Sequence, residues 1–382
     1  MAVLATALNL RLAVASVPPL IDEIRDAVPL SGTAAGVLTT LPVVCMAVGA
    51  TVVPRLVRRM GHELPLVLVG FTMAAGILIR LAPHVVALYL GTIVAGVGIA
   101  LGNVLVPSLV KRDFHERAGF MTGIYTMAIS TSAGIAAGLT VPIEDALGKG
   151  WREALAIWAL PAFVCAVIWV PFARHPSAVA DRRTQTPHRS SRLMRDRLAW
   201  QVALFMGVQS LMFYSLLSWL PSILQDHGMS KGTSGAYLSI FALLGIPVCF
   251  TVPLIAARMR DQRAAVVGSV LFLFVGILGL ILSPASAAIL WTVFAGISQA
   301  ATLALAFLFF VLRSHNQGEA AELSSMSQSI GYSLAALGPV IMGALHEATD
   351  SWTVPLIFLL VLLVPELIFG VEAGRDRQVG SG

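Results

Sequence analysis

The chain has little charge for its length. Only 12% of its 382 residues are Asp, Glu, Lys or Arg, whereas a soluble domain carries about 25%. Hydrophobic residues make up 57% of the chain, so too little polar surface remains to coat a water-soluble particle of this size. This composition excludes a soluble globular protein and predicts an all-α membrane protein that crosses the bilayer many times.

Catalytic and metal-ligating groups are also scarce in the apolar segments. The three cysteines fall inside apolar runs without metal-ligand spacing, and the eight histidines fall in loops or at segment ends. No acidic residue occupies the middle of a predicted span, and Glu366, about five residues from one end of the last span, is expected to reach water. We therefore predict no enzyme, no metal, no cofactor and no proton relay of the usual Asp, Glu or His kind.

Twelve apolar segments have the roughly 20 residues that cross a bilayer as a helix. The predicted spans are residues 1–21, 32–54, 64–82, 85–109, 118–141, 152–172, 199–221, 233–257, 264–283, 287–311, 323–345 and 352–371. Between the sixth and the seventh, residues 173–198 carry seven Arg, Pro176 and Pro187 but no apolar run, which is typical of a flexible linker. The chain is thus predicted to form two six-helix bundles, residues 1–172 and 199–382, joined by this linker.

The basic residues predict the orientation in the membrane. Most Lys and Arg residues fall in the loops on one side, together with both termini; the other side holds Arg25, Arg80, Lys149, Arg152 and Lys231. Because loops rich in Lys and Arg stay in the cytoplasm, both termini are predicted to be cytoplasmic. The same distribution explains the net charge of +5 without a nucleic-acid partner.

The two halves resemble each other as weak repeats. Ser31-Gly32-Thr33 opens the second span and Lys231-Gly232-Thr233 opens the eighth, while Gly150-Trp151 and Ser351-Trp352 precede the sixth and the twelfth. Several such pairs recur in the same order at a spacing of roughly 200 residues. Two parallel repeats predict a transporter with its binding site near the mid-plane, between the halves.

Arg11 is the one charged residue that falls about half-way along a predicted span. A cation at that depth costs roughly 2.5–3.5 kcal/mol on insertion scales, and it marks a functional site by default. No acidic residue in the spans is available to pair with it, so a planar guanidinium facing a wet cavity would bind an anion. The alternatives are that Arg11 reaches the membrane surface, or that it bonds to backbone carbonyls in the core. Asn9, two residues earlier, points to nearly the opposite side of the helix.

Other polar side chains in the spans are candidates for the same path, because a polar group in the bilayer core must face protein or a cavity. For each of them, ordinary contact between helices is the alternative interpretation. The candidates for substrate binding are Asn103, Tyr125, Gln209, Tyr214, Gln299, Gln328 and Tyr332, and Trp219 is a candidate for an aromatic wall.

Several strings carry a family resemblance. Twelve spans in two halves resemble the major facilitator superfamily, and Pro54–Gly61 is similar to its loop motif, with the basic pair but without the usual acid. Closer similarity, to the cyanate transporter (CynX/NimT) family, is carried by Ala7–Arg11, Leu38–Pro42, Gly102–Phe114, Gly138–Pro142, Gln209–Tyr214 and Gly331–Pro339. The resemblance implies a transporter in a bacterial inner membrane that works by alternating access, with cyanate or 2-nitroimidazole among the family's substrates.

We therefore predict a monomeric carrier of a small, cyanate-like anion, embedded in the lipid bilayer. The alternative is an exporter of small heteroaromatic compounds such as 2-nitroimidazole, with Trp219, Tyr214 and Tyr332 as a stacking wall. A ligand-sensing membrane receptor is a further alternative that the residues leave open.

Overall fold

The computed structural model describes residues 2–60, 63–113, 118–174, 193–315 and 317–380. Within these ranges every regular element is a helix. The first half contains α1 (Ala2–Asn9), α2 (Leu12–Ala15), η1 (Pro18–Leu20), α3 (Ile21–Ala27), α4 (Gly32–Met60), α5 (Glu63–Ile79), α6 (Val85–Asp113), α7 (Ala118–Leu147), α8 (Trp151–Ile157) and α9 (Ala159–Arg174). The second half contains η3 (Leu193–Arg195), α10 (Arg197–Asp226), α11 (Lys231–Leu243), α12 (Gly245–Ala256), α13 (Arg263–Leu282), α14 (Ala288–Leu312), α15 (Gln317–Ala335), α16 (Leu337–Thr349) and α17 (Thr353–Ala373).

The predicted all-α membrane architecture is confirmed. Eleven helical segments of the described chain are long and apolar enough to cross a membrane, and the shorter apolar helix Leu64–Ile79 corresponds to the predicted third span. Large apolar side chains such as Leu160, Phe250 and Leu282 are more than half exposed, as expected where lipid replaces water. Residue 61 of the predicted loop motif and residues 175–192 of the predicted linker lie outside the described residues.

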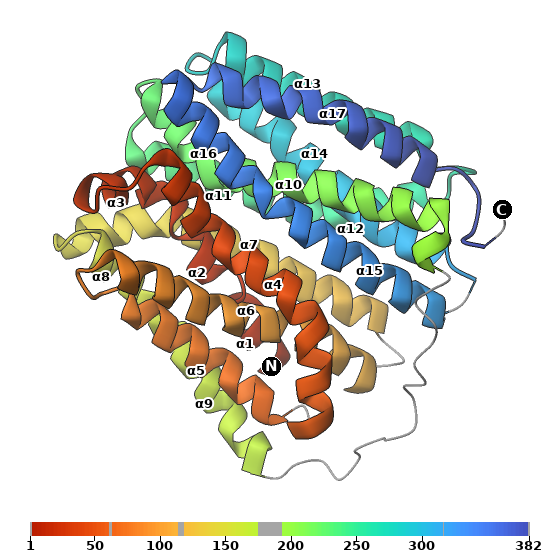
Figure 1. Cartoon of the computed structure of the whole chain (residues 1–382), viewed down its shortest axis with the longest axis horizontal. Coiled ribbons are helices and arrows are strands. Elements are labelled where there is room, and N and C mark those ends of the chain that lie inside the picture. Colours follow the sequence, from red (N-terminus) through yellow and green to blue (C-terminus); the bar gives the residue numbers. More distant parts are fainter. Residues whose placement is uncertain (1, 61–62, 114–117, 175–192, 316, 381–382) are drawn as a thin grey trace.

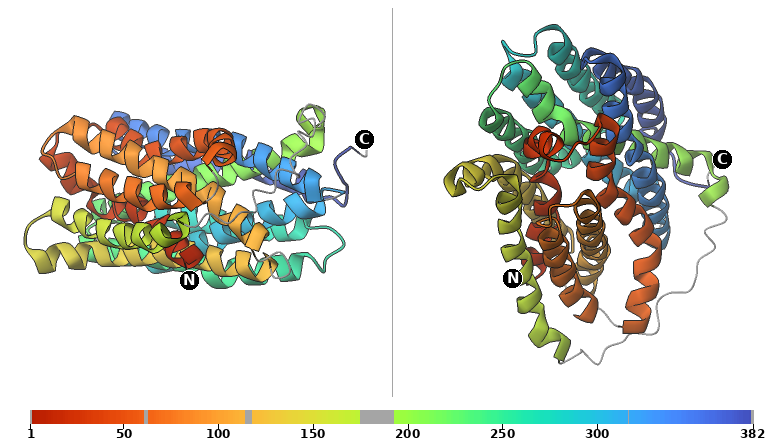
Figure 2. Two further views of the ribbon diagram at one scale, coloured as in Figure 1. Left: turned by 90° about the horizontal axis from the view of Figure 1, so that it is seen from below. Right: turned by 60° about the vertical axis from the view of Figure 1, so that its left-hand side comes forward.

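The two halves of the chain form two groups of helices. Figure 1 shows the first half, coloured red to yellow-green, on one side of the molecule and the second half, green to blue, on the other, and the right-hand view in Figure 2 keeps this division. The long helices of both groups run roughly parallel to one another, as expected for a bundle that spans a bilayer. Helix α4 packs against α15 and α16, and α7 packs against α11 and α12, so these helices form the interface between the halves.

Proline explains three breaks within the spans. A proline in a helix removes one backbone hydrogen bond and clashes with the carbonyl four residues earlier. Helices α8, α11 and α15 end at Ile157, Leu243 and Ala335. Each of these residues lies four positions before a proline, namely Pro161, Pro247 and Pro339. Proline accounts for the position of these breaks but does not by itself dictate a break, since Pro107 and Pro221 lie inside the continuous helices α6 and α10.

Glycines let the two halves approach closely. A Cβ atom added to Gly36 of α4 would lie 2.5 Å from the carbonyl oxygen of Pro339, at the α15–α16 break. A Cβ added to Gly235 of α11 would lie 2.9 Å from the carbonyl oxygen of Ala137 in α7. Small residues at membrane helix interfaces allow such backbone contact, and here they bring the halves together near the end of the molecule that carries Lys231, called the Lys231 end below.

Candidate functional site

Arg11 lies at a break in the first span that proline does not explain. Helix α1 ends at Asn9 and α2 begins at Leu12, and Arg11 has φ −115° and ψ −12° between them. The nearest downstream proline, Pro18, is seven residues away rather than four. The side-chain amide of Asn9 instead donates to the carbonyl of Ala5 at 2.8 Å, which competes with the helical ladder just before the break. Irregular backbone at this depth is tolerated only inside protein or along a cavity.

The guanidinium of Arg11 reaches from the first half of the chain to the second. Its Nη1 donates to the hydroxyl of Tyr214 in α10 at 2.6 Å, and its Cζ lies 5.2 Å from the centre of the Tyr214 ring. The ring of Phe213 lies 6.0 Å from the same carbon. No carboxylate among the described residues pairs with Arg11. A neutral phenol orients the cation but leaves its charge uncompensated.

Two more tyrosines belong to this cluster. Tyr332 of α15 lies within electrostatic range of both Arg11 and Tyr214, and Tyr125 of α7 lies within range of Tyr332. Arg11, Tyr125, Tyr214 and Tyr332 thus come from two elements of each half. We call these four residues the Arg11 cluster. The structure therefore brings together four of the residues that the sequence singled out.

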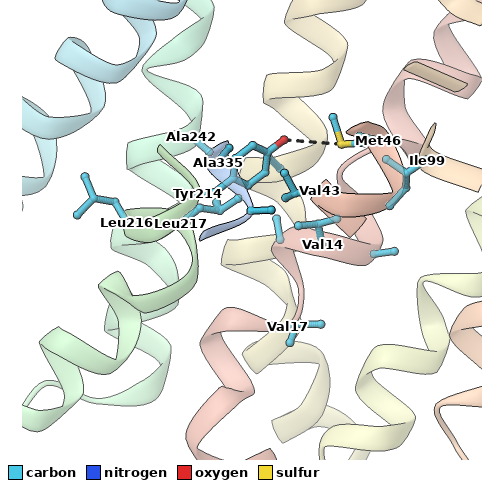
Figure 3. Close-up of a cluster of buried hydrophobic side chains, with 14 of the residues drawn as sticks. Val14, Val17, Val43, Met46, Ile99, Tyr214, Leu216, Leu217, Ala242 and Ala335 are labelled. Carbon is cyan, nitrogen blue, oxygen red and sulfur yellow. Dashed lines mark hydrogen bonds between the residues drawn. The ribbon is translucent and has the colours of Figure 1, made fainter. Parts of the chain in front are cut away.

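Tyr214 also contacts the first half directly. Its hydroxyl lies 3.8 Å from the sulfur of Met46 in α4, the dashed contact in Figure 3. Val43 of α4 and Val14 of the broken first span lie beside this contact in the same view. The phenol that bonds to Arg11 therefore has apolar side chains beside it, where an electrostatic interaction is stronger than in water.

Three of the predicted amides bond within their own helices. Asn103 donates to the carbonyl of Ile99 at 3.0 Å, Gln209 donates to Ser210 at 2.7 Å, and Gln328 donates to Ser324 at 2.9 Å. Gln328 is one turn before Tyr332 on the same face of α15, so it adjoins the Arg11 cluster. Asn103 follows Gly102 in α6. A Cβ atom added to Gly102 would clash with the side chain of Leu10, so this part of α6 lies beside the break in the first span.

Gln299 and Trp219 lie elsewhere. Gln299 is 2% exposed in α14, and neither polar atom of its amide has a hydrogen-bond partner among the described residues. Trp219 is fully buried near the Lys231 end of α10, where its indole donates to the carbonyl of Pro339 at 2.8 Å and its ring packs against Trp352. Near Arg11 the aromatic groups are instead Phe213 and Tyr214, and the Phe213 ring stacks on Phe241 at 5.8 Å.

Arg80 is a buried cation, which the sequence placed on the outer side of the membrane. It follows α5, is only 3% exposed, and donates from Nη1 to the carbonyl of Ala13 at 3.2 Å. The amide of Val17, which would bond to Ala13 in a regular helix, bonds to Val14 instead. Arg80 therefore satisfies a carbonyl that the irregular first span leaves unpaired, and it fixes the segment that follows Arg11. Its position at the end of an apolar run gave no signal of this contact.

Ionic contacts join the halves at the Lys231 end. The ammonium of Lys231, at the start of α11, lies 2.6 Å from Glu23 of α3 and 2.5 Å from Glu144 of α7. The carboxylate of Glu347 in α16 accepts from the backbone amide and the hydroxyl of Thr33 at the start of α4, at 3.1 and 3.0 Å. Together with the glycine contacts, these bonds close the interface between the halves at this end.

Removing the Lys231 contacts should loosen this closure. In Lys231→Ala, Glu23 and Glu144 lose their shared cation and repel each other, so the closed arrangement becomes less populated. Ala137 is buried against α11, and a cysteine that replaces it reports on this closure. We expect this cysteine to react several-fold faster with a membrane-impermeant thiol reagent in the Lys231→Ala variant than in the protein that keeps Lys231. Lys149→Ala, which removes an exposed lysine at the same end, is the matched control. Equal labelling rates in the two variants would contradict the closing role of Lys231.

Comparison with known proteins agrees with this architecture. A family model described as Major Facilitator Superfamily matches residues 1–336. The chain is 38% identical to "Uncharacterized transporter YycB" of Bacillus subtilis (strain 168) over 98% of its own length and 92% of the relative. It is 37% identical to the "2-nitroimidazole transporter" of Escherichia coli (strain K12), over 99% of this chain and 95% of that protein.

A more distant relative is the "Cyanate transport protein CynX" of Escherichia coli (strain K12). It is 28% identical, over 97% of this chain and 95% of that protein. Among solved structures, a bacterial homolog of the human lysosomal transporter Spinster superimposes with a TM-score of 0.76. The match covers 100% of this chain and 97% of that one at 16% identity, so it bears on the fold alone.

Proposed function

Because the chain belongs to the Major Facilitator Superfamily and its curated relatives are transporters, we propose that it carries a small monovalent anion of the cyanate type across the membrane, with Arg11 as the binding group. The observation that carries this proposal is the Arg11 guanidinium, which contacts a neutral tyrosine across the two halves and has no carboxylate partner among the described residues. A half-buried cation of this kind gains most from an anionic substrate, because the substrate supplies the missing charge.

The position of the cluster supports transport by alternating access. Arg11 and Tyr125 belong to the first half, and Tyr214 and Tyr332 to the second, so a ligand among them would contact both halves. Closure at the Lys231 end blocks access to the Arg11 cluster from that side. A rocking motion of the halves would open this end. Arg11 would attract the anion, while the three tyrosine hydroxyls would hydrogen-bond to it and set its orientation.

We further propose that the protein lies in a bacterial inner membrane as a monomer, with both termini in the cytoplasm. The basic loops support this orientation, which places the Lys231 end outside the cell. Closure at that end then corresponds to a carrier whose site faces the cytoplasm. The substrate would be bound or released on that side in this conformation.

The second candidate is export of small heteroaromatic compounds. The 37% identity to a 2-nitroimidazole transporter supports it, and so do the rings of Phe213 and Tyr214, which lie 6.0 and 5.2 Å from the Arg11 guanidinium. A flat nitro-substituted ring would stack on these side chains while its nitro oxygens accept from Arg11. This candidate uses the same cluster with a different substrate.

Flux measurements in proteoliposomes distinguish the two candidates. We expect labelled cyanate to enter vesicles that contain the protein, and other small linear anions in excess to compete with it. We expect 2-nitroimidazole neither to compete at similar concentration nor to be carried itself. Transport of 2-nitroimidazole without any movement of cyanate would overturn the anion proposal in favour of the second candidate.

A further inference from the structure

Glu366 is a buried acid that the substrate site does not use. It was expected to reach water near the end of the last span, and the structure corrects this: the side chain is 0% exposed. Neither of its carboxyl oxygens has a hydrogen-bond partner among the described residues. Ala373, the last residue of α17, lies seven positions after Glu366, which is about 10 Å along a helix.

The surroundings of Glu366 are apolar. Gly370, one turn later on the same face of α17, is so close to Phe205 of α10 and Val266 of α13 that a Cβ atom there would lie 2.8 and 2.6 Å from them. Leu363 and Leu359, on the preceding turns of this face, are buried as well. Because Glu366 shares this face, it points into the packed interior between α17, α10 and α13.

No described ionisable group on the neighbouring helices is placed to pair with Glu366. Helices α10, α13 and α16 pack against α17. Their ionisable residues lie at helix ends, apart from Tyr214, which bonds to Arg11. At the C-terminal end of α17, Arg313 donates to the carbonyls of Ala373 and Gly374, and Glu372 pairs with Arg375 at 2.6 Å. The residues at the helix ends are Arg197, Asp226, Arg263, His346 and Glu347.

This environment accommodates the neutral acid and not the anion. An ionised carboxylate without a partner in an apolar interior is far more costly than a neutral carboxylic acid, so a buried acid of this kind takes up a proton. An apolar side chain would fill the same space without the cost of a buried charge or of an unpaired polar group. An ionisable residue retained inside a membrane bundle therefore points to a function.

We propose that Glu366 is a proton-binding site in the second helical bundle, and that loss of its proton loosens the packing of α17 against α10 and α13. The ligand is the proton itself, which binds to a carboxylate oxygen. Helix α10 contacts α17 on one side and supplies Tyr214 to the Arg11 cluster on another. Protonation of Glu366 is thereby linked, through one helix, to the site where the halves meet.

Infrared spectroscopy of the full chain tests this proposal without any substrate, so its outcome is independent of the transported compound. At pH 7 we expect the carbonyl stretch of a protonated carboxyl group in the wild type, and its loss in Glu366→Gln. Glu372→Gln, which removes an acid paired at the end of the same helix, is the matched control and should leave the band unchanged. Glu366→Met should lose the same band, so the test does not depend on one variant folding. A band that persists in either Glu366 variant overturns the proposal.

Thermal unfolding supplies a second readout. Above the ordinary pKa of a glutamic acid, about 4.3, unfolding releases the proton that Glu366 holds in the folded protein. The unfolding temperature of the wild type should therefore fall by several degrees as the pH rises from about 5, and should level off once the folded protein also loses the proton. Glu366→Gln cannot ionise at this position and should lose that part of the pH dependence. If the unfolding temperature falls equally over this pH range in both proteins, Glu366 is not the proton-binding group.

Discussion

Arg11→Ala is expected to reduce cyanate uptake into proteoliposomes by about 30-fold or more, while the protein stays folded. Truncating one partner of a buried charge pair costs about 2–5 kcal/mol, and each 1.4 kcal/mol is a factor of about ten in affinity. The initial rate of uptake at low cyanate concentration measures this loss. Arg11→Lys should retain part of the activity, because it keeps the charge but loses the planar donor fork.

The control for this substitution is another arginine of the same half. Arg25 pairs with Asp22 at 3.4 Å in a partly exposed position on α3. An exposed pair contributes about 0–1 kcal/mol, so Arg25→Ala should change the rate of uptake by no more than about twofold. If Arg11→Ala retained half of the wild-type rate, Arg11 would not be the anion-binding group, although the transporter fold would be unaffected.

Gly36→Val should abolish most transport by a different route, with an expected loss of about 10-fold to 100-fold. The new Cβ would lie 2.5 Å from the carbonyl oxygen of Pro339 and 2.8 Å from the Cα of Val340. Both are backbone atoms and cannot move aside as a flexible side chain could, so the halves could not close at the Lys231 end. A carrier that cannot close on one side cannot complete its cycle. Net flux of cyanate is the measurement.

Gly268→Val is the matched control, because a Cβ at Gly268 in α13 meets nothing within 4 Å. It makes the same change in a helix but does not touch the interface between the halves. A cysteine replacing Ala137 should also become more reactive in Gly36→Val and not in Gly268→Val. Normal flux in Gly36→Val would mean that the close contact of α4 with the α15–α16 break is not needed for transport.

The spans could be predicted from the sequence because each depends on local composition. A run of about 20 apolar residues has few alternatives to a membrane helix. The repeated motifs were also informative: Ser31-Gly32-Thr33 lies at the start of α4, and Lys231-Gly232-Thr233 at the start of α11. The breaks before Pro161, Pro247 and Pro339 lie at prolines, but the prediction of continuous spans did not include them, and a proline such as Pro107 leaves its helix continuous.

Contacts between distant residues could not be predicted in the same way. The sequence singled out both Arg11 and Tyr214, but they are 203 positions apart, and only the fold shows that they touch. Depth in the membrane was inferred from distance to the end of a span, which failed for two residues. Arg80 bonds to the broken first span, and Glu366 points into its own bundle, because packing decides whether a residue near a helix end meets water.

The most direct test of the anion site is a crystal structure with selenocyanate, a linear anion with a charge of −1 and a strong anomalous scatterer. The account predicts an anomalous peak between the two halves, beside the Arg11 guanidinium and the Tyr214 hydroxyl, and its loss in Arg11→Ala. A peak elsewhere between the halves, or none beside Arg11 at a concentration that blocks cyanate uptake, would contradict it.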